Sequence, residues 1–430
     1  MNTTISQTAL FKVVLILSAL LFVSTIPRVN ADVCSKKFSK NLTVAAYYPS
    51  YNADLLPVEK IPWNLYSHLD YFVIKSPTTP QAKLEIEDED NMKSFVTAAK
   101  AHHVSVSLTI GGWTGSVYFS SLVATDSSRK AFAQNIAKVV KTYGFQGVDL
   151  DWEYPNVPGQ DGNQISKDDS SNLLKFLSVL REEVGPTSRL SAAVAVHGFM
   201  GPDGEYLKDH KPYAKFLDFI TIMAYDLYGP SSTPVVGPNA PLLDTCNDPG
   251  EKFSVAQAIE SWTSTGFPAS QILLGIPSYG YQYQMDNSKL NVTNFSGKSG
   301  ETSLFFGSID KSKQGKGSKS GQQVRSGCGS PTEGGNFVFK DLVTCGFLSS
   351  DGKTGLGGFE RHYDNCTHTP LLFNPSSKLL IAYDDADSLA EKTKYAKSKG
   401  LAGINIFDAA GDTPSNLLLN SINKAMYSKT

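Results

Sequence analysis

Three carboxylic acids, Asp149, Asp151 and Glu153, are spaced two residues apart and alternate with apolar residues. Because a β-strand sends alternate side chains to opposite faces, the three carboxyl groups are expected on one face. Like charges at this spacing raise the pKa of at least one carboxyl group. A carboxyl group whose pKa is raised towards neutrality can act as a general acid. The segment therefore predicts acid catalysis, and we call these three residues the acid ladder.

Two other interpretations of the ladder are the water-exposed face of a strand and a divalent metal site. An exposed strand usually mixes Lys, Thr and Ser with its acids, whereas here the sequence continues as Trp-Glu-Tyr-Pro. A metal site would require further acids or histidines nearby in the sequence, and no such cluster is present. We therefore favour the catalytic interpretation and expect no metal.

The first 31 residues have the features of a secretory signal. Lys12 precedes an apolar run from Val13 to Ile26, and Ala31 ends a group suited to cleavage. The run is short for a transmembrane helix, although an uncleaved anchor is the alternative. We expect a secreted, extracellular protein that begins near Asp32. The net charge of the full chain, −2, predicts no nucleic-acid partner and, after signal cleavage, no membrane partner.

Export makes disulfide bonds and glycans plausible. An odd number of cysteines leaves one thiol over, and the sequence does not reveal the pairing. The cysteines are Cys34, Cys246, Cys328, Cys345 and Cys366. The Asn-x-Ser/Thr sequons begin at Asn41, Asn291, Asn294 and Asn365.

Eight short segments rich in β-formers alternate with amphipathic helical patterns. Runs of consecutive apolar residues such as 192–196 are typical of strands buried on both faces, as in parallel sheets. This alternation predicts an α/β fold, a (β/α)8 TIM barrel. The strands are expected at residues 44–48, 68–74, 104–110, 147–153, 190–196, 219–224, 272–276 and 402–407.

Helix boundaries can also be predicted from short motifs. Ser254 with Gln257, and Ser388 with Glu391, have the spacing of capping boxes at helix N-termini. Gly400 lies where a helix C-terminus favours a residue that tolerates positive φ.

The alternation is interrupted between the seventh and eighth predicted strands. We interpret residues 282–376 as a small α+β insertion that includes a loop rich in Gly, Ser and Lys. The expected organisation is a signal at 1–31, the first part of the barrel at 32–281, the insertion at 282–376, and barrel completion at 377–430.

Polar and aromatic residues follow several predicted strands. In (β/α)8 barrels, catalytic groups lie at the C-terminal ends of the strands. Glu153 ends the fourth strand, residues 223–226 end the sixth, residues 407–408 end the eighth, and residues 111–113 end the third. These strand ends are expected to converge on one rim of the barrel.

The sequence resembles the family-18 glycoside hydrolases, which comprise chitinases and chitinase-like proteins. The family pattern Asp-x-x-Asp-x-Asp-x-Glu appears at residues 146–153 with Gln in its first position, and the Ser-x-Gly-Gly signature appears at 109–112 with Thr in its first position. Residues 223–226, 275–280 and 401–412 resemble the segments of strands six, seven and eight. The resemblance extends over about residues 42–424.

The resemblance implies a retaining mechanism in which the substrate supplies the nucleophile. Glu153 would protonate the glycosidic oxygen while the sugar's N-acetyl carbonyl attacks the anomeric carbon. Asp151 would hold the acetamide N–H and stabilise its developing charge, and Asp149 would hydrogen-bond Asp151. Tyr225 would donate to the acetamide oxygen, and Asp226 would contact the distorted sugar. This mechanism requires no cofactor, and the implied partner is chitin or a chito-oligosaccharide.

Aromatic and polar residues of the rim are expected to contact the sugar. Trp152 has the opposite strand parity to the acids, so we assign it to packing, whereas Tyr47 is a further stacking candidate. The expected substrate-binding residues are Tyr48, Trp113, Tyr154, Met223, Asp226, Tyr279 and Phe407.

Three positions depart from the family pattern. Gln146 replaces an Asp, which removes a charge that we expect to lie close to the ladder. Phe407 replaces the Trp beneath the sugar being cleaved, and Phe has less stacking area and no indole N–H. Thr109 replaces a Ser, which keeps the hydroxyl group.

These observations support two functions. Gln146 and Phe407 favour a chito-oligosaccharide-binding protein whose hydrolysis is weak or lost, and we lean towards this interpretation. The retained ladder favours an active chitinase that cleaves β-1,4-linked N-acetylglucosamine. A storage or structural barrel without sugar affinity is a third interpretation, against which the complete ladder argues.

Overall fold

The computed structural model describes residues 42–229, 236–243, 254–290, 293–294, 302–304 and 335–428. Eight parallel strands close into a barrel in the order β1-β15-β7-β6-β5-β4-β3-β2. This arrangement confirms the predicted (β/α)8 barrel. The strands are β1 (Thr43–Pro49), β2 (His68–Ile74), β3 (Ser105–Gly111), β4 (Gly147–Asp151), β5 (Arg189–Val194), β6 (Phe219–Ile222), β7 (Ile272–Pro277) and β15 (Gly403–Phe407).

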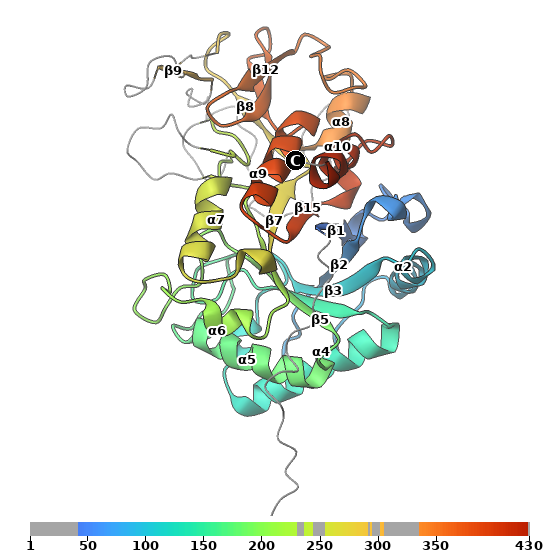
Figure 1. Ribbon diagram of the computed structural model, residues 1–430, viewed down its shortest axis with the longest axis vertical. Helices are drawn as coiled ribbons and strands as arrows, with labels where there is room; N and C mark the ends of the chain where they lie inside the picture. The colour runs from blue at the N-terminus through green and yellow to red at the C-terminus, as the bar shows by residue number, and fades with distance from the viewer. Residues whose placement is uncertain are drawn as a thin grey trace, which may run out of the picture. The chain divides into compact units, whose positions relative to one another are not determined.

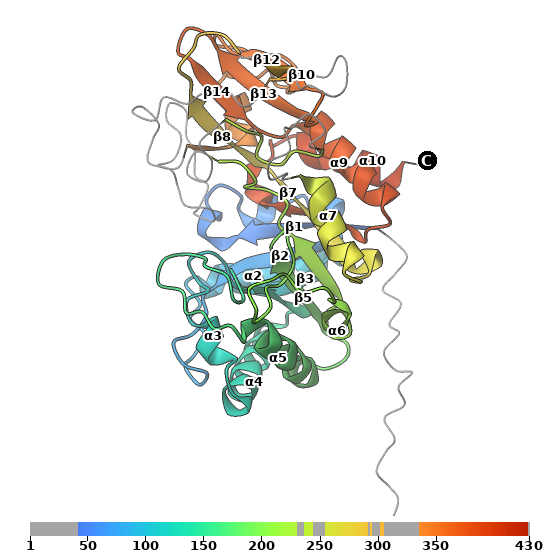
Figure 2. The same ribbon diagram turned by 90° about the vertical axis from the view of Figure 1, so that its left-hand side faces the viewer.

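The strands are buried on both faces, as their apolar composition predicts. Their outward side chains pack against surrounding helices, several of which are visible below the strands in Figure 2. The longer helices are α2 (Glu89–Ala101), α4 (Asp126–Tyr143), α5 (Asp169–Val184), α7 (Val255–Ser264), α9 (Ala386–Ser398) and α10 (Leu417–Tyr427).

One of the two predicted capping boxes requires correction. At α7 the Ser254 hydroxyl accepts from the Gln257 backbone N–H, which confirms Ser254 as the N-cap, and it donates to the Gln257 side chain at 3.3 Å. Ser388, however, is not the N-cap of α9. Asp385 is the N-cap, because its carboxylate accepts from the Ser388 N–H while the Ser388 hydroxyl accepts from the Asp385 N–H. The helix therefore begins about one turn earlier than the motif at Ser388 indicated.

An antiparallel sheet lies between the seventh and eighth barrel strands in sequence, which confirms the predicted insertion (Figure 1). Its strand order is β11-β8-β14-β13-β12, and the short helix α8 (Phe339–Thr344) follows β11. The boundaries 282 and 376 stay a prediction, although the sheet itself begins at 279 and its last strand ends at 382. Its strands are β8 (Tyr279–Gln284), β11 (Asn336–Val338), β12 (Glu360–Asp364), β13 (Thr369–Asn374) and β14 (Leu379–Ala382).

Buried ion pairs connect the insertion to the barrel helix that follows it. Asp384, just after β14, pairs with Lys392 of α9, and both side chains are 0% exposed. The Ser388 hydroxyl also donates to Asp384 at 2.7 Å. One turn away, Arg361 of β12 pairs with Asp385 at 2.6 Å. These pairs fix the end of the insertion on α9.

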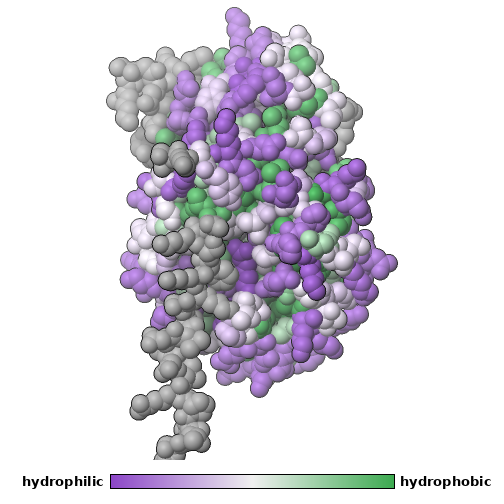
Figure 3. All heavy atoms as spheres, turned by 45° about the vertical axis from the view of Figure 1, so that its right-hand side comes forward, coloured by the Kyte–Doolittle hydropathy of each residue, from purple (hydrophilic) through white to green (hydrophobic). Residues whose placement is uncertain are grey.

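Large apolar side chains are rarely exposed in the described residues. Figure 3 shows hydrophobic residues on one face only in small patches among hydrophilic ones. None of the described helices combines the length and the hydropathy that crossing a bilayer requires. The exposed large apolar residues are Ile165, Tyr206, Leu356 and Tyr427.

Several sequence features lie outside the described residues. These are the predicted signal, Cys34, Cys246 and Cys328, the sequon positions Asn41 and Asn291, and most of the loop rich in Gly, Ser and Lys. The two described cysteines, Cys345 and Cys366, are both disulfide-bonded.

Candidate functional site

The acid ladder runs from inside the barrel to its C-terminal end. Asp149 and Asp151 lie on β4, whereas Glu153 follows the strand and does not end it. All three side chains are buried, with Asp149 1% and Glu153 5% exposed. The Ser116 hydroxyl donates to the Asp151 carbonyl at 3.0 Å and accepts from the Glu153 N–H at 3.0 Å. Asn163 donates to the Glu153 carbonyl at 2.9 Å, so neighbouring loops fix the ladder's backbone.

Hydroxyl groups from the two neighbouring strands hold Asp149. Ser191 of β5 donates to its Oδ1 at 2.7 Å, and Thr109 of β3 donates to its Oδ2 at 3.3 Å. Thr109 therefore supplies the hydroxyl of the family's Ser. Burial, followed by the charge of Asp70, raises the pKa of Asp149 to about 7, while both hydroxyl bonds oppose the shift.

The upper two acids have a different environment. Burial raises the pKa of Asp151 well above its usual value, and the charges of Glu153 and Asp149 add to the effect. Asp151 Oδ1 is buried without a hydrogen-bond partner. Burial also raises the pKa of Glu153 to about 8, opposed by a hydrogen bond from Tyr154 and increased by the charge of Asp226. Glu153 therefore carries a transferable proton at neutral pH.

Residues after β6 add a second polar group to this end of the barrel. Asp226 adopts a left-handed backbone conformation with φ 58°, and its N–H donates to Asn239 Oδ1 at 2.7 Å. Its carboxylate accepts from the hydroxyls of Tyr279 and, at 2.5 Å, Tyr281. Tyr225 is 8% exposed. Burial raises the pKa of its hydroxyl, and the charges of Asp151 and Asp226 add to this effect, which indicates that Tyr225 lies near the ladder.

Phe407 lies at the centre of an aromatic group at the end of β15. Its ring centroid lies 5.7 Å from that of Tyr225 with a 30° interplanar angle. It is also 5.7 Å from Tyr47 and 5.3 Å from Phe72, and it is partly exposed. Tyr279 completes the group at 6.3 Å. An exposed aromatic face is the kind of surface on which a sugar ring can stack, and Phe407 is partly exposed.

Three further predicted sugar-binding residues follow the C-terminal ends of barrel strands. Trp113 lies partly exposed in the loop after β3, Met223 packs near the aromatic group after β6, and Tyr154 follows Glu153. Trp152 stacks on Phe119 with centroids 5.2 Å apart, which confirms its assignment to packing.

Tyr48 was predicted to bind the sugar, but its side chain lies outside the barrel. Its ring stacks on Phe95 of α2 at 4.8 Å, and its hydroxyl donates to the Leu56 carbonyl at 3.2 Å. Strand parity explains the error, because adjacent residues of β1 face opposite sides. Tyr47 contacts the aromatic group inside the barrel, and Tyr48 therefore packs outside it.

Gln146 lies away from the ladder, contrary to the expectation that its replacement removes a charge close to the ladder. Gln146 precedes β4, so it lies at the strand end opposite Glu153, and its side chain is exposed. Its Oε1 accepts from the Val106 N–H at 2.9 Å, and its Nε2 donates to the Gly144 carbonyl at 2.9 Å. Gln146 joins the starts of two strands, and its amide replaces the family's Asp without touching the site.

Sequence reasoning missed several residues that shape the site. Tyr281 and Asn239 hold Asp226, Ser116 bridges the ladder's backbone, and Phe72 contacts Phe407. The parity of β2 could have identified Phe72 as inward-facing. Asn239 and Ser116 lie in loops, where sequence carries no periodic signal.

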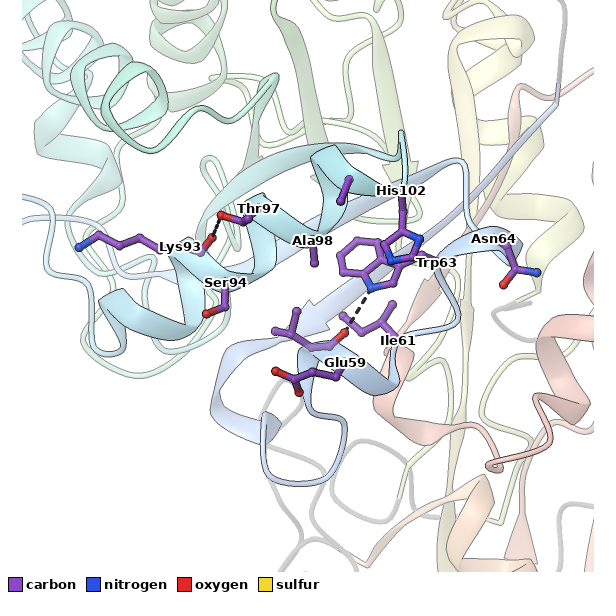
Figure 4. Close-up of a pocket in the computed structure, with 11 residues that line it drawn as sticks. Glu59, Ile61, Trp63, Asn64, Lys93, Ser94, Thr97, Ala98 and His102 are labelled. Carbon is purple, nitrogen blue, oxygen red and sulfur yellow. Dashed lines mark hydrogen bonds between the residues drawn. The ribbon is translucent and has the colours of Figure 1, made fainter.

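A separate groove of about 780 Å³ lies on the outer side of the barrel, between α2 and the short helices η2 (Val58–Lys60) and η3 (Trp63–Leu65) (Figure 4). Trp63 donates from Nε1 to the Val58 carbonyl at 3.2 Å, and its ring stacks on His102 at 5.8 Å. None of the ladder acids lines this groove, so it is distinct from the site. Within the described ranges, no group of three or more His, Cys, Asp or Glu side chains is arranged to hold a metal ion.

The ladder predicts that stability depends on pH. The pKa values of Asp149 and Glu153 are raised above their unfolded values, so the folded state binds these protons more tightly. Their contribution is fully present at acidic pH and is lost as pH rises through about 7 and 8. We therefore expect the urea-unfolding free energy to fall between pH 5 and about 8.5.

The variant Asp149→Asn should flatten this dependence, because it removes one of the titrating groups. The exposed Asp203→Asn is the matched control and should keep the wild-type slope. An Asp149→Asn protein with the wild-type slope would contradict the assignment.

Comparison with known proteins agrees with this geometry. The family model "Glycosyl hydrolases family 18" matches residues 43–412. A chitinase-like effector of Moniliophthora roreri is 36% identical over 371 residues, which cover 85% of this chain and 89% of that protein. Chitinase A1 of Niallia circulans is 32% identical, over 72% of this chain and 41% of that protein. The crystal structure of a chitinase from Rhizomucor miehei superimposes with a TM-score of 0.75 at 29% identity, covering 89% of this chain and 99% of that one. The chain belongs to glycosyl hydrolase family 18.

Proposed function

We propose that this chain is a secreted chitinase-like protein that binds chito-oligosaccharides at the C-terminal end of the barrel and hydrolyses them weakly or not at all. The observation that carries the proposal is Phe407, which stands at the centre of the aromatic group beside the ladder. Two relatives at 36% and 33% identity are described as chitinase-like effectors, which supports the chitinase-like part of the proposal.

Binding would use groups that the free protein leaves available. Asp151 Oδ1 is a buried acceptor without a donor, and the acetamide N–H of N-acetylglucosamine would supply one. The hydroxyl of Tyr225 would donate to the acetamide oxygen, and the sugar face would stack on Phe407. These contacts recognise an N-acetylated sugar, and they do not require turnover.

Weak hydrolysis would follow from the ring at position 407. Phe offers a smaller stacking surface than Trp and no indole N–H, so it holds the distorted sugar less firmly. A loss of about 3 kcal/mol of transition-state stabilisation lowers the rate about a hundredfold. We assign no part of this loss to Gln146, because its amide binds backbone groups at the far end of β4.

The alternative is an active retaining chitinase. The acid ladder is complete, and the buried Glu153, with a pKa of about 8, can protonate a glycosidic oxygen at neutral pH. Asp151 would stabilise the charge on the acetamide as its carbonyl attacks the anomeric carbon.

One pair of measurements separates these functions. Chitotetraose binding is measured by calorimetry, and turnover is measured with a fluorogenic chito-oligomer. Binding without turnover above background supports the proposal, whereas robust turnover that Glu153→Gln abolishes supports the active chitinase. Absence of both binding and turnover would contradict both functions and would support the third interpretation, a storage or structural barrel without sugar affinity.

Restoring the indole should raise any hydrolysis. We expect Phe407→Trp to increase kcat/KM by about tenfold or more, because the larger ring stabilises the distorted sugar. Gln146→Asp is the matched control, since it restores the other family residue at a remote position, and it should leave kcat/KM unchanged. The account of Phe407 fails if Gln146→Asp restores hydrolysis and Phe407→Trp does not.

Export is part of the proposal. It rests on the signal-like residues 1–31 and on the effector relatives, and it would place the sequons in a compartment that glycosylates them. The intact mass of the exported protein would test cleavage before Asp32 and the presence of glycans.

A further inference from the structure

Four side chains inside the barrel form one polar layer. Asp70, Asp149, Thr221 and Asn405 come from β2, β4, β6 and β15, which are alternate strands, and this is how a layer of a (β/α)8 barrel is built. Asn405 Nδ2 donates to Asp70 Oδ2 and to Thr221 Oγ1, both at 3.1 Å, so these three share a level. Asp149 completes the layer, which therefore contains two carboxylic acids.

N–H donors surround Asp70. His68 Nε2 lies 2.8 Å from Asp70 Oδ1, and Asn405 donates to Oδ2. Burial, followed by the charge of Arg189, lowers the pKa of His68 although Asp70 opposes the shift, and the lowered pKa favours the neutral ring. The Ser105 hydroxyl, 2.5 Å away, can donate to His68 Nδ1, which leaves the proton on Nε2 to face Asp70. A carboxyl group that accepts N–H bonds at both oxygens is held in its charged form.

Asp149 has a contrasting set of partners. Among the described residues, its two oxygens accept hydrogen bonds from the hydroxyls of Ser191 at 2.7 Å and Thr109 at 3.3 Å, and these bonds do not offset the effects of burial and of the Asp70 charge on the pKa of Asp149. Two carboxyl groups in one buried layer cannot both be charged without a large electrostatic cost. The charge of Asp70 therefore favours a proton on Asp149.

Other ionisable groups around Asp149 are few. Arg189 at the start of β5 favours the charged form of Asp149, whereas Asp151 above it and Tyr47 of β1 do not. The facing side chains of β3, β6 and β15 in this layer and its neighbours are uncharged, namely Thr109, Thr221 and Asn405.

We propose that Asp70 is a positioning residue of the acid ladder, because its carboxylate lies in the same buried layer as Asp149 and keeps a proton on Asp149, beneath Asp151, the acid proposed to hold the sugar's acetamide. The role towards the sugar rests on the proposed function. The placement of the proton is a property of the free protein and is tested without any sugar.

The test is a ¹³C NMR titration of ligand-free protein labelled at aspartate carboxyl groups, with the Asp149 signal assigned by Asp149→Asn. In Asp70→Asn, the titration midpoint of Asp149 should fall by about one pH unit or more, because a neighbouring negative charge is lost. In Ser191→Ala, the midpoint should rise, because a bond that stabilises the charged form is lost. Opposite shifts from two neutral replacements would not result from general loosening of the barrel.

An unchanged midpoint in Asp70→Asn, or shifts of both variants in the same direction, would overturn the proposal. Asp70→Ser removes the same charge with a smaller side chain and replaces Asp70→Asn if that variant does not fold. Chitotetraose affinity measured from pH 5 to 9 supplies the second readout. Its decline at alkaline pH should begin at lower pH in Asp70→Asn than in the wild type. If the wild type binds no sugar but the titration shifts as expected, the proposed function fails and the proton assignment stands.

Discussion

Replacing Glu153 with Gln should lower the turnover of any chito-oligosaccharide by about 10²- to 10⁴-fold, the range that a positioned general acid contributes. Gln keeps the size of the side chain but has no transferable proton. Sugar affinity should be retained, because Asp151, Tyr225 and Phe407 are unchanged. Single-turnover kinetics and calorimetry on the same preparation measure the two quantities.

Glu205→Gln is the matched control for this change. Glu205 is exposed in the loop after β5, and the same neutralisation there should alter neither rate nor affinity. Equal and measurable turnover by the wild type and Glu153→Gln would show that Glu153 is not the general acid of the hydrolysis. Loss of affinity in Glu153→Gln would assign this residue to binding.

The largest loss of stability is expected from Lys392→Met. Lys392 and Asp384 are both 0% exposed, and the replacement leaves Asp384 buried without its counter-ion. Breaking a buried ion pair from one side costs about 3–5 kcal/mol. Burial already raises the pKa of Asp384, with Lys392 opposing that shift, so the carboxyl group should take up a proton in the variant. Urea unfolding at neutral pH measures the loss.

Lys394→Met makes the same chemical change at an exposed position of α9 and should shift the unfolding free energy little. The double variant Asp384→Asn/Lys392→Met should recover part of the loss, because no uncompensated charge remains. If Lys392→Met and Lys394→Met are equally stable, the pair does not hold the insertion on α9.

The barrel could be predicted because its strands are buried on both faces. Runs such as 192–196 have no polar residue that would fit a surface strand, and turn signals separate them from amphipathic helices. The insertion could be predicted from the loss of this alternation. The start of α9 could not be predicted well, because Ser388 and Asp385 both suit an N-cap. Only the reciprocal bonds decide between them.

The parts of the candidate site that could be predicted are those whose positions follow from the spacing of residues within one strand. The ladder, Tyr225, Asp226 and Phe407 lie within a few residues of strand ends, so their convergence follows from the fold. Parity was not applied to Tyr47 and Tyr48, and it would have separated them. The error at Gln146 has another origin. A family motif shows which residue is replaced, but it does not show that the replaced residue lies at the opposite end of the strand.

The polar layer below the ladder depends on contacts that no local pattern contains. Asn405 and Asp70 are 335 residues apart in the chain and meet only after the barrel closes. The sequence does give one hint, because His68 and Asp70 alternate with apolar residues in β2. Two inward polar residues in a buried strand indicate a polar interior.

The pairing of β1 with β15 has a consequence for biosynthesis. The strand at 43–49 finds its second neighbour only when residues 403–407 have been made. Until then β1 and β7 each have one unpaired edge, and such edges readily join those of other chains. A nascent or truncated chain that stops before residue 403 lacks the strand that covers these two edges, so we expect it to associate with other chains more readily than the complete barrel does.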